Sequence, residues 1–360
     1  MRTSLPRSPD QVRDRRIEEV VPLLTPALIL HQLPLGPEQA DVVLRGREEI
    51  SAIVNGDDDR LLVVVGSCSV HDLDAAREYA DLLQAKSSEL SHELCVVMRV
   101  YFEKPRTTIG WKGMINDPHL DESGDVNAGL RMARGLLLDV LSLGLPVGCE
   151  FLDPIMPQYI SDAVSWGAIG ARTTESQIHR QLASGLSMPV GFKNRTDGNI
   201  DVAVDAVRAA GVQHVFAGID LTGIPAILRT AGNRDCHLIL RGGKAAPNHT
   251  APQVEEALGK LRAAGLPERV VIDASHDNSG KDHARQPGVV ADITRQVSGG
   301  NEAIVGVMLE SFLVEGRQDL GAGAPLTYGQ SITDACMSWD TTVGVLDELA
   351  AAVGARRAAT

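Results

Sequence analysis

The run LLVVVGSC (residues 61–68) places five apolar side chains in a row, then a Gly-Ser pair, and ends on a cysteine. Such a run is typical of a strand that is buried on both faces of a parallel sheet. Seven further runs of the same kind follow, and each ends on a side chain that can bind or react: LCVVMR (94–99), PVGCE (146–150), AIGAR (168–172), PVGFK (189–193), CHLILR (236–241), VVIDASH (270–276) and IVGVMLE (304–310).

Amphipathic segments with apolar positions at helical spacing separate these runs, for example 73–83 and 126–143. Strands that alternate with helices eight times predict an α/β fold, a (β/α)₈ TIM barrel, whose strand ends all open on one face. Residues 61–360 are expected to form this barrel, with 214–233 as an inserted β-hairpin before the sixth barrel strand. Residues 1–60 are expected to form an N-terminal extension with helices over 14–24 and 37–54.

The charge and cysteine content exclude several classes of protein. With 34 Lys and Arg against 47 Asp and Glu, the net charge is −13, which disfavours nucleic acid and anionic membranes as partners. We find no apolar run long enough to span a membrane and no signal peptide, so a cytoplasmic protein is expected. Five scattered cysteines without CxxC spacing argue against a disulfide framework and a zinc finger.

Six basic residues stand at or just after the strand ends: Arg99, Lys104, Arg106, Arg172, Lys193 and Arg241. A guanidinium binds carboxylate or phosphate through two parallel hydrogen bonds, and an ammonium adds a compact charge. Each of these residues taken alone is most simply a surface ion pair. Gathered on one face of a barrel, they predict a site for a small molecule that carries several negative charges.

A second group of residues, from four distant segments, combines a thiol, an imidazole and two carboxylates: Cys68, His276, Glu310 and Asp334. Mixed sulfur, nitrogen and oxygen donors suit a first-row divalent ion better than Mg²⁺ or Ca²⁺. From the residues alone, a buried core cysteine and an ordinary satisfied histidine are the simpler interpretation, and metal binding is only suggested. Motifs for nucleotide hydrolysis, metalloproteolysis, esterase chemistry and dinucleotide binding are absent.

Several segments together resemble one known family. They are GSCSVHD (66–72), MRVYFEKPRTTIGWKGMINDPH (98–119), GARTTES (170–176) and ITDAC (332–336), and similar matches continue along nearly the whole chain. The resemblance is to class I 3-deoxy-D-arabino-heptulosonate 7-phosphate (DAHP) synthase of the bacterial feedback-regulated type. That family condenses phosphoenolpyruvate with erythrose 4-phosphate and releases phosphate, in the first step of the shikimate pathway to aromatic amino acids.

The resemblance implies roles for the strand-end residues. It implies one divalent metal ion (Mn²⁺, Fe²⁺, Co²⁺ or Zn²⁺) held by Cys68, His276, Glu310 and Asp334. It implies that phosphoenolpyruvate is bound by Arg99, Lys104, Arg172, Lys193 and Arg241, and the phosphate of erythrose 4-phosphate by Arg106 and Thr107. The catalytic candidates for the proton and water steps are Lys104, Glu150, Lys193 and Asp334.

The same resemblance implies regulation and assembly. In the family, the hairpin and the N-terminal extension help to form a pocket for an aromatic amino-acid effector, and Asp14, Phe151 and Ser187 match positions of that pocket. Gly218 departs from the family, which usually has Ser there, so the identity of the effector is left open. The extension also resembles an element that builds dimers and tetramers, and a homodimer or homotetramer is expected.

The sequence leaves three alternative functions open. One is a related condensation of phosphoenolpyruvate with a different phosphorylated aldehyde sugar, against which KPRTT (104–108) argues as the erythrose 4-phosphate motif of the family. Another uses Lys193 as a Schiff-base nucleophile. The third is a catalytically silent binding protein on the same fold.

Overall fold

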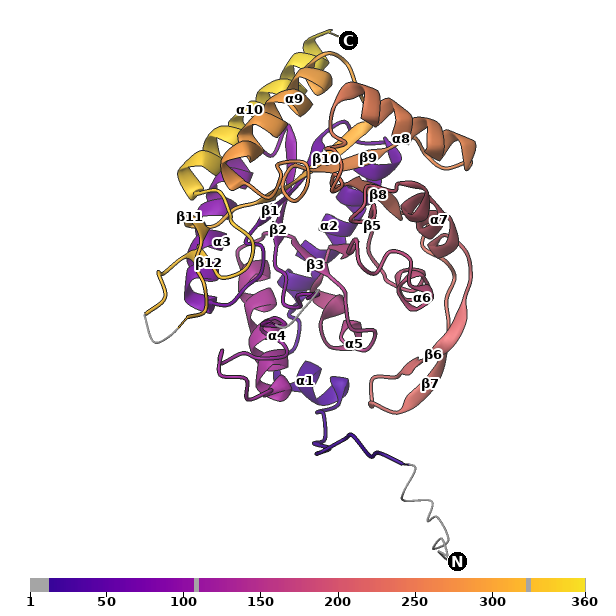
Figure 1. Ribbon diagram of the computed structural model, residues 1–360, viewed down its shortest axis with the longest axis vertical. Coiled ribbons are helices and arrows are strands. Elements are labelled where there is room, and N and C mark those ends of the chain that lie inside the picture. The colour runs from indigo at the N-terminus through magenta and orange to yellow at the C-terminus, as the bar shows by residue number, and fades with distance from the viewer. Residues whose placement is uncertain (1–12, 107–109, 322–324, 360) are drawn as a thin grey trace, which may run out of the picture.

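The computed structural model describes residues 13–106, 110–321 and 325–359, and eight parallel strands close into one barrel within them (Figure 1). The strands, in order around the barrel, are β1 (Leu61–Gly66), β10 (Ile304–Glu310), β9 (Val270–Asp273), β8 (His237–Leu240), β5 (Val190–Lys193), β4 (Trp166–Ile169), β3 (Val147–Glu150) and β2 (Leu94–Arg99). In the register, Val63 of β1 lies opposite Val96 of β2 and Val307 of β10, which closes the ring. The predicted (β/α)₈ barrel is confirmed.

One helix covers the N-terminal end of the barrel. Helix α2 (Pro37–Asn55) contributes Ile50 and Ile53 to the same buried cluster as the interior side chains of the strands. Gly46 of α2 lies against Pro146 and Ser165, which come just before β3 and β4. The helix predicted over 37–54 is therefore present, and it leaves the C-terminal ends of the strands as the open face.

The longer outer helices are stabilised by the apolar side chains that they bury. Helix α4 (Val126–Ser142), for example, buries Leu130, Leu137 and Leu141 and begins at Asp125, whose side chain accepts from the backbone N of Ala128 at 3.0 Å. The other helices are α1 (Pro26–Gln32), α3 (Leu73–Glu89), α5 (Pro157–Ile160), η2 (Ser161–Ala163), α6 (Gln177–Ala183), α7 (Asp201–Ala210), α8 (Ala251–Ala263), η3 (His283–Arg285), α9 (Gln286–Ser298) and α10 (Trp339–Ala359).

The inserted hairpin has the form expected, and one part of the N-terminal extension does not. Strands β6 (Val215–Ile219) and β7 (Pro225–Arg229) pair antiparallel and project from the barrel beside α6 and α7 (Figure 1). The helix predicted over 14–24 is wrong, because this stretch is irregular. Leu23 and Leu24 at its end pack against the core, but Ile17, Val20 and Val21 are 55%, 82% and 67% exposed, so a helix over this stretch would gain little tertiary support.

Two further strands lie beyond the end of β10. Strand β11 (Val314–Arg317) pairs with β12 (Gln330–Ser331) in a small separate sheet that the sequence reading did not include. This sheet leads directly into the segment that carries Asp334. Among the described residues, no helix combines the length and apolar character that crossing a membrane requires.

Candidate active site

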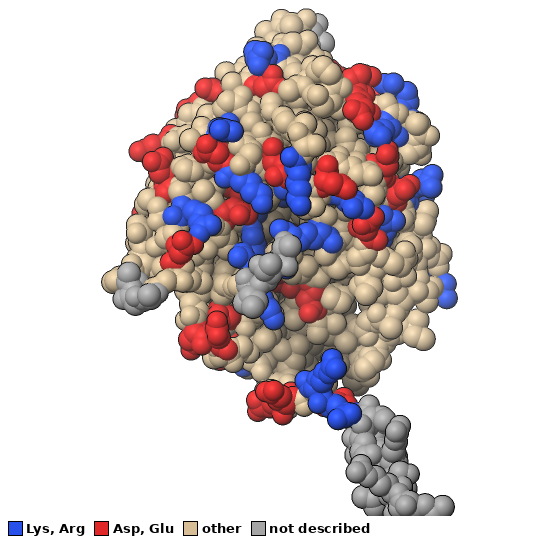
Figure 2. Space-filling model, in the orientation of Figure 1, with Lys and Arg blue, Asp and Glu red and all other residues tan. Residues whose placement is uncertain are grey.

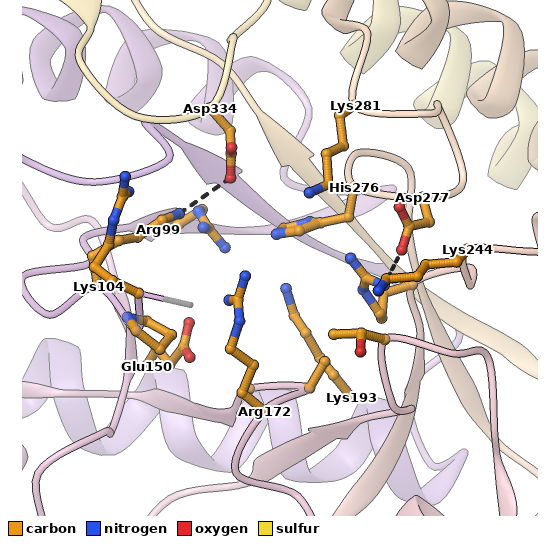
Figure 3. A pocket seen from close by; sticks show the side chains of 16 residues that line it. Arg99, Lys104, Glu150, Arg172, Lys193, Lys244, His276, Asp277, Lys281 and Asp334 are labelled. Carbon is orange, nitrogen blue, oxygen red and sulfur yellow. Dashed lines mark hydrogen bonds and ion pairs between the residues drawn. The ribbon is translucent and has the colours of Figure 1, made fainter. Parts of the chain in front are cut away.

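The C-terminal ends of the strands surround a cavity of about 510 Å³, around which Lys and Arg gather on the face shown in Figure 2. All six cations singled out at the strand ends line it. The charged and ionisable residues of its wall are Arg99, Lys104, Arg106, Glu150, Arg172, Lys193, Arg241, Lys244, His276, Asp277, Lys281 and Asp334 (Figure 3). The overall negative charge of the chain is thus reversed locally, and the pocket suits an anion.

The four candidate metal ligands converge at one side of this cavity. Cys68, Glu310 and Asp334 each offer a ligand atom within 4.8 Å of the others, although they come from the loop just after β1, from β10 and from the segment after β12. The Nε2 atom of His276 lies 3.8 Å from Oε1 of Glu310. One sulfur, one imidazole nitrogen and carboxylate oxygens form a donor set that first-row divalent ions accept, so the residues fit such an ion.

Two cations contact the same cluster. The Nζ atom of Lys104 lies 2.6 Å from Sγ of Cys68 and 3.4 Å from Oδ2 of Asp334, and Nη2 of Arg99 lies 3.0 Å from Oε1 of Glu310. Burial opposes ionisation of Asp334, yet Lys104 and His276 hold its pKa below the ordinary value. Burial, and then Glu310, raise the pKa of the Cys68 thiol to about 11, so binding of a metal by this thiol releases a proton.

Asp273 connects the metal cluster to the anion site, and sequence reasoning missed it. This fully buried carboxylate accepts from Nζ of Lys193 at 2.8 Å and lies 2.9 Å from Nδ1 of His276. Burial alone would raise the pKa of Asp273, but the facing His276 and Lys193 hold it well below its ordinary value. A carboxylate on Nδ1 leaves Nε2 of His276 available as a ligand atom. An acid within an otherwise apolar strand run, VVIDASH, was the signal in the sequence.

Gln286 fixes another ligand. Its buried side chain amide donates to the backbone O of Glu310 at 2.9 Å and accepts from the backbone N of Glu310 at 3.0 Å. This pair of bonds from the first residue of α9 holds the end of β10, and with it the Glu310 carboxylate, in place.

Three buried asparagines hold the backbone that carries Arg241. Asn194 accepts from the backbone N of Arg241 at 2.8 Å and donates to the O of Gly242 at 2.9 Å, and Asn248 accepts from the N of Gly242 at 2.7 Å. Asn278 donates to the backbone O of Asp273 at 2.8 Å and accepts from the N of Asn248 at 2.7 Å. The loops after β5, β8 and β9 are thereby joined by uncharged groups.

Gly242 itself has to be a glycine. Its φ of 74° lies in the left-handed region, and a Cβ there would meet the backbone N of Asn278 at 2.6 Å. The close approach of these two loops brings Arg241, the last member of the CHLILR run, to the cavity wall.

Arg99 and Glu150 are positioned by neighbours in the barrel. The guanidinium of Arg99 stacks over the ring of Tyr101 at 3.6 Å from its centroid, which holds it below the cavity. Oε1 of Glu150 lies 2.2 Å from where a Cβ on Gly170 would be, so the absent side chain makes room for this carboxylate. Glu103, which the sequence reading passed over, accepts from the backbone N of Leu152 at 3.3 Å and ties the loop of Lys104 to the loop of Glu150.

The remaining predicted residues are placed as follows. Arg106 and Arg172 are exposed at the mouth of the cavity, and Thr107 lies outside the described residues. Of the four effector candidates, Phe151 is fully buried, Gly218 lies in β6, and Ser187 and Asp14 are exposed. The hairpin does meet the N-terminal extension, because the backbone N of Ala27 donates to the O of Leu221 at 2.7 Å.

Comparisons with known proteins agree with this geometry. The model of the DAHP synthetase I family matches residues 33–347. The chain is 57% identical over 344 residues to the Phe-sensitive phospho-2-dehydro-3-deoxyheptonate aldolase of Escherichia coli strain K12, covering 96% of this chain and 98% of that protein. It is 51% identical over 352 residues to the tyrosine-inhibited aldolase of the same name from Schizosaccharomyces pombe, covering 97% and 95%. The solved structure of phospho-2-dehydro-3-deoxyheptonate aldolase from Francisella tularensis superposes with a TM-score of 0.93 at 49% identity, covering 95% and 99%.

Proposed function

The chain belongs to the DAHP synthetase I family, and we propose that the pocket at its barrel mouth binds phosphoenolpyruvate beside a divalent metal ion and condenses it with erythrose 4-phosphate. Its activity is that of a DAHP synthase, which opens aromatic biosynthesis. The observation that carries the assignment of the site is the contact between two groups of side chains. Lys104 and Arg99, from the anion-binding side, contact Cys68 and Glu310 of the ligand cluster at 2.6 and 3.0 Å.

Phosphoenolpyruvate carries a carboxylate and a phosphate, and we assign both to the cations of the strand ends. Arg99, Lys193 and Arg241 are only 2%, 3% and 4% exposed, so their charges act through a medium of low polarity. Lys104 and the more exposed Arg172 complete this set, and Arg106 and Thr107 are assigned to the phosphate of erythrose 4-phosphate. A forked guanidinium suits either anionic group.

We propose that Cys68, His276, Glu310 and Asp334 hold one divalent ion, drawn from Mn²⁺, Fe²⁺, Co²⁺ and Zn²⁺. Such an ion, when bound, supplies Lewis-acid polarisation of the aldehyde oxygen. Asp273 orients His276 for this role, and Gln286 orients Glu310.

The water that adds to C2 of phosphoenolpyruvate is assigned to Glu150. Its half-buried carboxylate shares the cavity wall with Lys193, and as a base it would accept a proton from that water. Lys104 and Asp334, 3.4 Å apart, are assigned to the proton that the aldehyde oxygen gains. Because the Lys193 ammonium is bound to the buried Asp273 carboxylate, we favour an anion-binding role for it over a Schiff base.

We further propose that an aromatic amino acid inhibits the chain, since the similar proteins are named as Phe-sensitive and tyrosine-inhibited. Residues 1–60 and the hairpin are the proposed regulatory and oligomer-building parts of a homodimer or homotetramer. The contact between Ala27 and Leu221 supports this, because it couples the extension to the hairpin. A cytoplasmic location is proposed from the metabolic step.

The test is release of phosphate from phosphoenolpyruvate with Mn²⁺, comparing erythrose 4-phosphate with arabinose 5-phosphate as the aldehyde. We expect turnover with erythrose 4-phosphate, its loss in Lys193→Ala, and no lysine adduct after borohydride treatment. Faster turnover with arabinose 5-phosphate would replace the proposed aldehyde. Near-normal turnover of Lys193→Ala would remove Lys193 from the assignment.

A further inference from the structure

One carboxylate of the pocket has no part in the reaction proposed above. Eight Lys and Arg side chains line the cavity together with the carboxylates of Glu150, Asp277 and Asp334. Asp334 belongs to the metal cluster and Glu150 lies by Gly170, which leaves Asp277 unassigned. An acid in a pocket built for anions opposes binding, so its placement calls for a physical reason.

Asp277 contacts Arg241, one of the buried anion-binding arginines. Its Oδ2 atom forms an ion pair with Nη1 of Arg241, drawn as a dashed line in Figure 3. The two side chains are 16% and 4% exposed, so water screens the pair only weakly. The backbone N of Asp277 also donates to the O of Arg241 at 3.2 Å, which fixes the acid beside the arginine.

The backbone that carries Arg241 is held in place without this acid. The backbone N–H groups of Arg241 and Gly242 donate to the side chains of Asn194 and Asn248, and Asn278 donates to the backbone O of Leu240. All three asparagines are uncharged. What Asp277 adds is one negative charge at the point where a phosphate would contact the guanidinium. A phosphate held there has a carboxylate as its immediate neighbour, and like charges at such distances repel strongly.

We propose, resting on the function proposed above, that Asp277 is a built-in competitor for the phosphate at Arg241, which weakens phosphate binding and speeds departure of the inorganic phosphate product. A pocket with eight cations would otherwise retain a free dianion and slow turnover. Arg241 exchanges the departing phosphate for Asp277, so the buried guanidinium keeps a partner throughout the cycle. Asp277 thus favours release of the phosphate product over its retention in the pocket.

The experiment measures binding of inorganic phosphate to the full-length, Mn²⁺-loaded chain by calorimetry. Asp277→Asn keeps the shape and removes the charge, and we expect it to bind phosphate about tenfold more tightly than the wild type. Its turnover should become more sensitive to added phosphate, and rapid-quench kinetics should show a burst of product before slow phosphate release. Asp277→Ala should also bind phosphate more tightly than the wild type. Because this variant changes the shape of the side chain as well as its charge, agreement between the two variants would assign the effect to the charge.

Asp292→Asn is the matched control. Asp292 is 20% exposed, close to the 16% of Asp277, and it pairs with His249 and Arg295 outside the cavity. Its loss of one negative charge should leave phosphate affinity unchanged. Unchanged or weaker phosphate binding in Asp277→Asn would overturn the proposal and make Asp277 an orienting group for Arg241. A wild-type chain that neither binds phosphate nor releases it from the two substrates would instead overturn the proposed function.

Discussion

Replacing Asp273 by Asn tests how the strand end of β9 couples the two halves of the site. The carboxylate lies 2.9 Å from Nδ1 of His276 and 2.8 Å from Nζ of Lys193, and it is fully buried. The amide of Asn keeps the size of the side chain but removes the charge, and one of its two polar atoms becomes a donor. His276 then loses the acceptor that orients its ring, and Lys193 becomes a buried cation without its carboxylate.

The size of the effect follows from these contacts. Loss of a hydrogen-bonded partner behind a metal-binding histidine typically weakens metal affinity 10- to 100-fold, or about 1.4 to 2.8 kcal/mol. Leaving Lys193 unpaired should lower the free energy of unfolding by about 3 to 5 kcal/mol. Since domains are typically stable by about 5 to 15 kcal/mol, most of the variant should remain folded.

Titration of the metal-depleted chain with Mn²⁺, followed by electron paramagnetic resonance, measures the first quantity, and urea unfolding measures the second. Asp292→Asn is again the control. Asp292 lies 3.0 Å from Nδ1 of His249, so this substitution breaks a carboxylate–histidine pair of similar length away from the cavity. The coupling would be refuted if Asp273→Asn bound Mn²⁺ with a Kd within twofold of the wild type while His276→Ala abolished binding.

Three further predictions follow from single contacts. Asn248→Ala leaves the buried backbone N of Gly242 without its acceptor at 2.7 Å, so we expect KM for phosphoenolpyruvate to rise about tenfold while Mn²⁺ affinity stays constant in steady-state and binding assays. Burial raises the pKa of Glu103 from 4.5 to about 8, so between these pH values the folded chain holds a proton that the unfolded chain has released, and the free energy of unfolding falls as the pH rises across this range. In urea unfolding, Glu103→Gln should remove up to roughly 5 kcal/mol of this pH-dependent loss. If the free energy of unfolding of wild type and variant changed with pH in parallel, the prediction would be wrong. Because the pKa of the Cys68 thiol is about 11, apparent Mn²⁺ affinity should rise about tenfold per pH unit near neutrality, and a pH-independent Kd would argue against thiolate ligation.

The barrel and its mouth were predictable because both depend on short-range patterns. Apolar runs that end on Arg99, Lys193 or Arg241 specify where each strand stops, and closure of a parallel barrel brings such ends to one face whatever the intervening loops do. The same closure brings Cys68 close to Glu310 of β10, whereas Asp334 joins them from the segment after β12, outside the barrel.

The supporting contacts were not predictable, because they depend on which loops approach one another. Asn194, Asn248 and Asn278 stand in three separate loops, and nothing in their spacing shows that their amides meet. Asp273 was read only as a residue of its strand, so its contacts with His276 and Lys193 were not predicted. The error over residues 14–24 has the opposite origin, since the local pattern was helical but Val20 has no surface to pack on.

In the proposed function, one pocket holds a divalent ion and phosphoenolpyruvate together. Nuclear relaxation of phosphoenolpyruvate in the presence of the Mn²⁺-loaded chain tests this most directly, because a paramagnetic ion shortens the relaxation times only of nuclei close to it. We expect strong enhancement at the phosphorus and the vinyl protons in the wild type, and its loss in Cys68→Ala. Tight binding of phosphoenolpyruvate without any enhancement would show that the ion and the substrate occupy separate sites, and the proposed joint site would be wrong.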